Sequence, residues 1–146
     1  MDQLERPSEL LWDERRAWFE EQEAQRAKAG APAPSEQACA LIIDLQAVFC
    51  SGAWAAAVIL AYAIAEAQSS HRAARPEGVG EGDWKWLRAL RNRLVHENPG
   101  KASFTVEDQW MRRDLWEERA RHAVVIAFAA LYPDLSGREN AAGERP

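Results

Sequence analysis

Residues 36–68 read EQACALIIDLQAVFCSGAWAAAVILAYAIAEAQ, and this stretch decides the fold. After the opening Glu36, its only charged side chains are Asp44 and Glu66, and Ser51-Gly52 divides it into two apolar segments. Glycine ends or kinks a helix, and the many alanines of the second segment let neighbouring helices approach closely. We therefore expect two packed, mostly buried helices joined near Ser51-Gly52.

Amphipathic helical patterns flank this pair on both sides. Ser8 is the expected N-cap of a first helix and Gly30 its expected stop, while Ser35 is the expected N-cap of the next helix. The prolines of the 31–34 connector interrupt the helical pattern between them. Near the carboxyl end, Thr105 and Asp114 are alternative caps of a final apolar helix that Pro133 stops.

The domain organisation follows from these patterns, because the sequence shows no alternating strand pattern and no hairpin signal. The fold class is therefore predicted to be all-α, with a bundle of four to five helices. We expect an N-terminal amphipathic helix and connector in residues 1–34, the bundle in residues 35–133, and a frayed tail in residues 134–146.

The chain has 146 residues and a formal net charge of −5, which argues against a general nucleic-acid coat protein. Between residues 84 and 101 the balance reverses, with only Glu97 set against a group of basic side chains: Lys85, Arg88, Arg91, Arg93 and Lys101. This basic run is equally compatible with a solvated helix face and with a local binding patch.

The two cysteines and the hydropathy pattern suggest a cytoplasmic protein without a membrane anchor. Cys39 and Cys50 fall on one expected helix about 16 Å apart, too far for a disulfide, so both are expected to be core thiols. No cluster of Cys and His predicts a zinc site, and no cofactor is indicated. The apolar run of residues 53–65 is shorter than the roughly 20 residues that span a bilayer, and the N-terminus lacks a signal-peptide core.

Residues 83–98, DWKWLRALRNRLVHEN, combine a leucine stripe with a polar cluster. The spacing predicts a helix capped by Asp83 and ended by Pro99-Gly100. At about 100° per residue, Asn92 and His96 share one face, so Asn92 can steer the imidazole, whereas Arg91 lies about 140° away from His96. For Arg91 and His96 to serve one site, the guanidinium must reach around the helix, the helix must loosen near His96, or a second copy must take part.

This segment resembles the motif of the HEPN superfamily, in which an Arg, a polar residue and a His lie near the end of a core helix. As in that superfamily, two apolar helices precede the motif helix. The resemblance covers residues 35–132 and matches Arg91, Asn92 and His96. It implies an all-α bundle and a metal-independent endoribonuclease, often a toxin or defence effector, whose homodimer places both motifs in a shared cleft. Other members are inactive partners or RNA-binding modules, so a non-catalytic interaction or nucleotide-binding module is the alternative.

The resemblance also bears on partners, because one HEPN branch is paired with nucleotidyltransferase antitoxins. That branch carries a modified Tyr two residues after the His, where this chain has Asn98. The resemblance therefore does not imply regulation through that tyrosine, and a different antitoxin partner is the alternative.

The residue types suit metal-independent RNA cleavage. A His with a pKa near neutrality can act as base or acid on the 2′-hydroxyl, and Arg91 would stabilise charge on the phosphate. The side chains expected to orient these groups or to bind substrate are Asn92, Arg93, Arg88 and Glu66. The alternative interpretation is structural, with His96 as a favourable helix-terminal charge and Arg91 paired with a carboxylate such as Glu66.

Trp84 and Trp86 open the same helix on different sides, so both are hard to bury within one monomer. One of them is expected to mark a protein interface, with base stacking as the sharper alternative. His71 and His122 have no convincing set of partners in the sequence.

Overall fold

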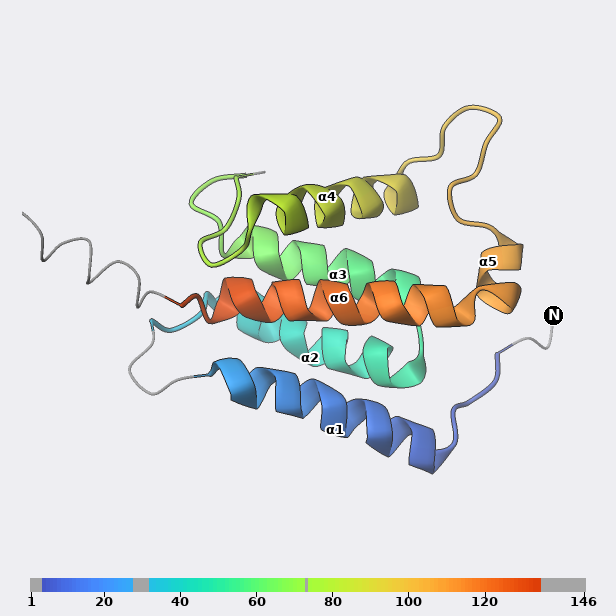
Figure 1. Cartoon of the computed structure of the whole chain (residues 1–146), viewed down its shortest axis with the longest axis horizontal. Coiled ribbons are helices and arrows are strands. Elements are labelled where there is room, and N and C mark those ends of the chain that lie inside the picture. Colours follow the sequence, from blue (N-terminus) through green and yellow to red (C-terminus); the bar gives the residue numbers. More distant parts are fainter. Residues whose placement is uncertain (1–3, 28–31, 73, 135–146) are drawn as a thin grey trace, which may run out of the picture.

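The computed structural model describes residues 4–27, 32–72 and 74–134. These ranges form six helices and no strand, which confirms the all-α class (Figure 1). The helices are α1 (Glu9–Arg26), α2 (Glu36–Ser51), α3 (Trp54–Ala67), α4 (Glu81–Val95), α5 (Val106–Met111) and α6 (Arg113–Leu131). The number exceeds the expected four or five because α5 forms a short helix of its own.

The predicted pair of helices in residues 36–68 is confirmed as α2 and α3. Gly52 ends α2 in the left-handed region with φ +81°, which a glycine adopts without strain. α3 is apolar on nearly every side, and it packs between α2, α4 and α6. Its residues Ala57, Val58 and Ala61 are fully buried, as expected of a central helix with small side chains.

Two arginines from other helices complete the end of α2. Arg15 of α1 donates to the carbonyl of Cys50 at 3.1 Å, and Arg113 of α6 donates to the carbonyl of Gly52 at 2.7 Å. Both guanidinium groups also lie over the ring of Trp54, at 4.7 and 5.6 Å from its centre. These contacts satisfy carbonyls that a helix leaves unpaired at its C-terminus.

α1 belongs to the same core as the helices of residues 35–133. Ser8 caps it as predicted, accepting from the backbone N–H of Leu11 at 3.2 Å, and Ser35 caps α2 in the same way. Phe19 is buried against Phe49 and Phe128, so α1 packs on α2 and α6. The helix ends at Arg26, and the expected stop at Gly30 lies outside the described residues.

The predicted limits of α4 were wrong at both ends. Its N-cap is Gly80 instead of Asp83, which lies in the first turn and whose carboxylate lies 3.0 Å from Nε2 of His122. Its last residue is Val95, before the expected stop at Pro99-Gly100. Residues 98–101 form a separate turn, with Gly100 at φ +79° and the N–H of Lys101 donating to Asn98 at 3.1 Å.

Both alternative caps near the carboxyl end lie at helix starts, but only Thr105 forms a capping box. Thr105 and Asp108 exchange hydrogen bonds at the start of α5. Asp114 lies inside the first turn of α6, whose N-cap is Arg112. α6 ends at Leu131, two residues before Pro133, and the tail expected from residue 134 lies outside the described residues except for Asp134 itself.

The expectation that both cysteines are core thiols was wrong for one of them. Cys50 is buried but Cys39 is exposed, although their spacing of eleven residues places both on one side of α2. Of the two indoles that were expected to be hard to bury together, Trp84 is buried against Tyr62, whereas Trp86 is half-buried and stacks on His122. One chain therefore buries Trp84 but leaves part of Trp86 exposed.

Candidate functional site

The candidate site lies where α4 ends and the chain turns back. His96 is the C-cap of α4 with an extended backbone, φ −126° and ψ 118°, and its N–H donates to the carbonyl of Asn92 at 3.0 Å. Pro99 and Gly100 then occupy the two central positions of a tight turn, where proline fixes φ and glycine supplies a positive φ. The turn places Asn98 beside the end of the helix.

A shallow surface depression of about 260 Å³ is lined by four residues from this segment, Asn92, Arg93, His96 and Asn98. Asn92 and His96 share it, as their helical spacing predicts. Arg93, Asn98 and His96 are exposed, so a charged ligand can reach the imidazole without displacing any core side chain. The depression offers an imidazole, a guanidinium and two amides to such a ligand.

Arg91 is half-buried on α4 and is not one of the residues that line this depression. Its guanidinium donates to the side-chain oxygen of Asn92 at 2.8 Å and lies over the ring of Tyr62, 4.6 Å from the ring centre. Asn92 therefore links Arg91 to the depression, because it binds the guanidinium and also lines the depression. The last helical residue is Val95, and the backbone of His96 is already extended. This is the loosening of the helix near His96 that would help Arg91 and His96 to serve one site.

The remaining predicted site residues lie on two helices. Arg88 is exposed on α4, one turn before Asn92 on the same face, and Arg93 lines the depression. Glu66 is half-buried on α3, one turn after Tyr62. Burial raises the pKa of the Tyr62 phenol, and the Glu66 carboxylate raises it further, while Arg91 acts in the opposite direction. The predicted residues thus gather on α4 with Glu66 beside Tyr62.

Sequence reasoning missed a cluster at the other end of α4. His122 of α6 stacks on Trp86, with ring centres 4.1 Å apart, and its Nε2 lies 3.0 Å from the carboxylate of Asp83. His122 thus has two partners, contrary to the expectation. The spacing of Asp83 and Trp86, three residues apart, predicts that they share one side of the helix. Nothing in the sequence predicts that α6 packs against that side.

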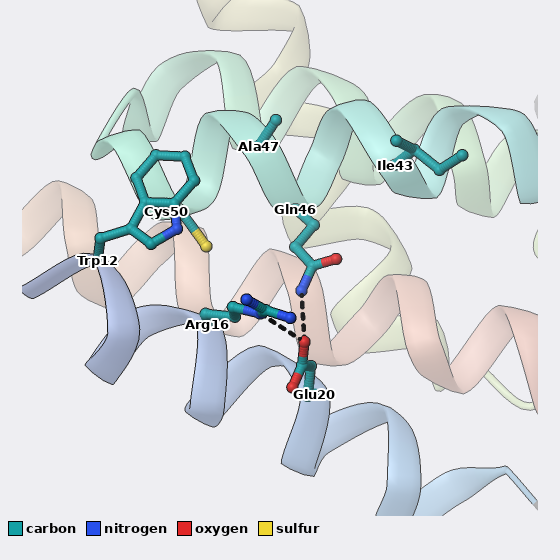
Figure 2. A pocket seen from close by; sticks show the side chains of 7 residues that line it. All are labelled: Trp12, Arg16, Glu20, Ile43, Gln46, Ala47 and Cys50. Atoms are coloured by element: carbon teal, nitrogen blue, oxygen red, sulfur yellow. Dashed lines mark hydrogen bonds and ion pairs between the residues drawn. The ribbon is translucent and has the colours of Figure 1, made fainter. Parts of the chain in front are cut away.

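A second shallow groove, of about 250 Å³, runs between α1 and α2 (Figure 2). Figure 2 shows Arg16 and Gln46 pointing toward Glu20, with Trp12 and Ile43 at opposite ends of the groove. Arg16 donates to Glu20 at 2.9 Å and Gln46 donates to the same oxygen at 3.4 Å. The polar groups of this groove therefore bind one another.

Among the described residues, no group of three or more His, Cys, Asp and Glu side chains could hold a metal ion. None of the six helices of the described ranges is long and apolar enough to cross a membrane. No family model matches the chain, and the searches of curated proteins and of solved structures gave no match either. Its function is therefore inferred from the chemistry of its own residues.

Proposed function

We propose that the chain is a HEPN-like, metal-independent endoribonuclease, acting as a toxin or defence effector, that cleaves RNA with Arg91 and His96 at the cleft of a homodimer. The observation that carries this proposal is the double role of Asn92, which accepts a hydrogen bond from Arg91 and lines the depression with His96. Arg91 and His96 lie on different sides of α4, and Asn92 links them into one polar site.

The residue types define the chemistry. One imidazole removes the proton of the 2′-hydroxyl, which attacks the adjacent phosphorus, and an imidazolium gives a proton to the leaving 5′-oxygen. Arg91 stabilises the charge that grows on the phosphate oxygens, and Arg93 with Arg88 binds neighbouring phosphates. Because one His cannot easily serve as base and acid in one turnover, two copies that bring their His96 side chains together complete the site.

Partners follow from the same resemblance. RNA is the substrate in the cytoplasm, and an antitoxin holds the enzyme inactive. A nucleotidyltransferase is one class of antitoxin, although Asn98 occupies the position of the tyrosine that such partners modify, so it would have to act at another residue.

The experiment is RNA cleavage by the purified protein in the presence of a metal chelator. His96→Ala should lower the rate by about 10²- to 10⁴-fold, the usual contribution of an acid-base group. The matched control is His71→Ala, which removes an exposed loop imidazole and should cleave like the wild type. Both variants should keep the helical circular dichroism signal. A wild type that cuts no RNA under these conditions contradicts the proposal.

A non-catalytic interaction module is the second candidate, favoured by an apolar surface on α5 and the start of α6. Val106, Trp110, Met111 and Leu115 are 71%, 49%, 78% and 40% exposed. Exposed Trp and Met are enriched where proteins bind one another. An inactive wild type that binds a protein partner, with binding lost in Trp110→Ala, would favour this function instead.

A further inference from the structure

The ring of Tyr62 contacts two side chains of α4. Trp84 stacks on it at 5.1 Å with an interplanar angle of 10°, and the guanidinium of Arg91 lies 4.6 Å from its centre. Residues 84 and 91 are two helical turns apart, a rise of about 10.5 Å. The single ring of Tyr62 therefore contacts α4 at two positions that are two turns apart.

The contact restricts Arg91. An arginine on a helix surface ordinarily samples many rotamers, and ordering it costs conformational entropy. Here the face of Tyr62 supports the guanidinium from α3, and the Asn92 oxygen binds it at 2.8 Å. Tyr62 itself is only 3% exposed, so it cannot touch a polymeric substrate directly.

We propose that Tyr62 is a positioning residue of the candidate site, holding the Arg91 guanidinium in the orientation that acts on the scissile phosphate. This inference rests on the proposed function of Arg91. Tyr62 acts through its aromatic face, which the cation needs, and its hydroxyl is dispensable. Trp84 stacks on the same ring, so Tyr62 connects the buried start of α4 to Arg91.

The first experiment compares two substitutions of the same side chain. Tyr62→Leu keeps apolar volume but removes the π face, and it should lower kcat roughly five- to tenfold with KM within about twofold, because Arg91 acts on charge that grows in the transition state. Tyr62→Phe keeps the face and should retain the wild-type kcat. If Tyr62→Leu loses helical signal, Tyr62→Met replaces it, since Met adapts to irregular spaces.

A double-mutant cycle separates positioning from general packing. In an Arg91→Ala background, Tyr62→Leu should cause no further loss of kcat, since the residue through which it acts is absent. Losses that multiply in the double variant would overturn the inference, because they would show that Tyr62 acts independently of Arg91. An equal loss of kcat in Tyr62→Phe would also overturn it.

A second measurement is independent of activity. The Nε–H resonance of Arg91, assigned by its absence in Arg91→Ala, should be shifted by the Tyr62 ring current and should move to an ordinary position in Tyr62→Leu. An Arg91 signal that is the same in wild type and Tyr62→Leu overturns the positioning role alone. A wild type that cuts no RNA overturns the proposed function and with it the catalytic purpose of the contact, even where the signal depends on Tyr62.

Discussion

The α2–α3 pair and the carboxyl end of α4 are opposite kinds of structure. In the pair, Leu45, Phe49 and Ala61 are fully buried, and the two helices pack against each other and against α1, α4 and α6. At the end of α4, His96 and Arg93 face solvent, and the helix stops at Val95. Burial in the α2–α3 pair therefore stabilises the fold, whereas side chains at the carboxyl end of α4 can be exchanged at little cost to stability.

Removing a large core side chain should cause the largest loss in the free energy of unfolding. Phe49 is fully buried and its ring contacts Trp18, Phe19 and Trp54. Phe49→Ala should lower the free energy of unfolding by about 3–5 kcal/mol, since it removes buried area and leaves a cavity. The measurement is denaturant-induced unfolding followed by circular dichroism.

The matched control for that prediction is Trp110→Ala, which removes a still larger aromatic group from a surface where it is 49% exposed. It should change the free energy of unfolding by no more than about 0.5 kcal/mol. Similar losses in the two variants would contradict the division between core and surface.

Substitutions at the two glycines Gly52 and Gly82 test the same comparison without removing a large side chain. Gly52 has φ +81°, and a Cβ there would meet guanidinium nitrogens of Arg15 and Arg113 at 3.0 Å. Gly52→Ala should destabilise the protein by about 1–2 kcal/mol, the cost of a left-handed conformation in an L-residue. Thermal unfolding at fixed pH measures the change.

Gly82→Ala is the control, because Gly82 lies inside α4 and a Cβ at that position meets nothing within 4 Å. Alanine in a helix is favoured over glycine by roughly 0.5–1 kcal/mol, so this variant should be more stable than the wild type. A destabilised Gly82→Ala protein would show that the first turn of α4 does not remain helical in solution.

Local signals in the sequence predicted the first of these regions well and the second only in part. Ser8, Ser35 and Gly52 act on backbone groups within a few residues, so their roles could be read from neighbouring positions. The shared face of Asn92 and His96 is local in the same sense. The proposed catalytic roles of these residues stay predictions.

The errors concern contacts between helices that are far apart in sequence. Asp83 was expected to cap α4, but its carboxylate lies beside His122 of α6, 39 residues later. Trp84 and Trp86 were expected to be hard to bury together, and nothing in the sequence indicated that Tyr62 of α3 would bury Trp84. Periodicity states which side of a helix is apolar, but it does not state which helix packs there, so these partners could not be derived from spacing.

The smallest effect is expected in the segment that returns the chain from the candidate site to the core. The Asp108 carboxylate accepts from the backbone N–H of Thr105 at 2.8 Å and from its hydroxyl at 2.9 Å, with 10% of its side chain exposed. The Thr105 backbone N–H is the main reason that the pKa of Asp108 is lowered, and the hydroxyl and Arg112 contribute in the same direction against the effect of burial.

A lowered folded-state pKa fixes the sign of the pH dependence. The stabilisation is fully present above the ordinary aspartate pKa of about 3.9 and is lost as the pH falls through the lower pKa of the folded protein. Asp108→Asn should therefore cost roughly 1 kcal/mol at pH 7, typical of a helix cap, and the difference from wild type should shrink when unfolding is measured at pH 3 or below. A difference that stays constant from pH 7 to pH 2 would mean that the charge of Asp108 does not stabilise α5. RNA cleavage at neutral pH should survive this substitution, because α5 lies outside the depression that contains His96.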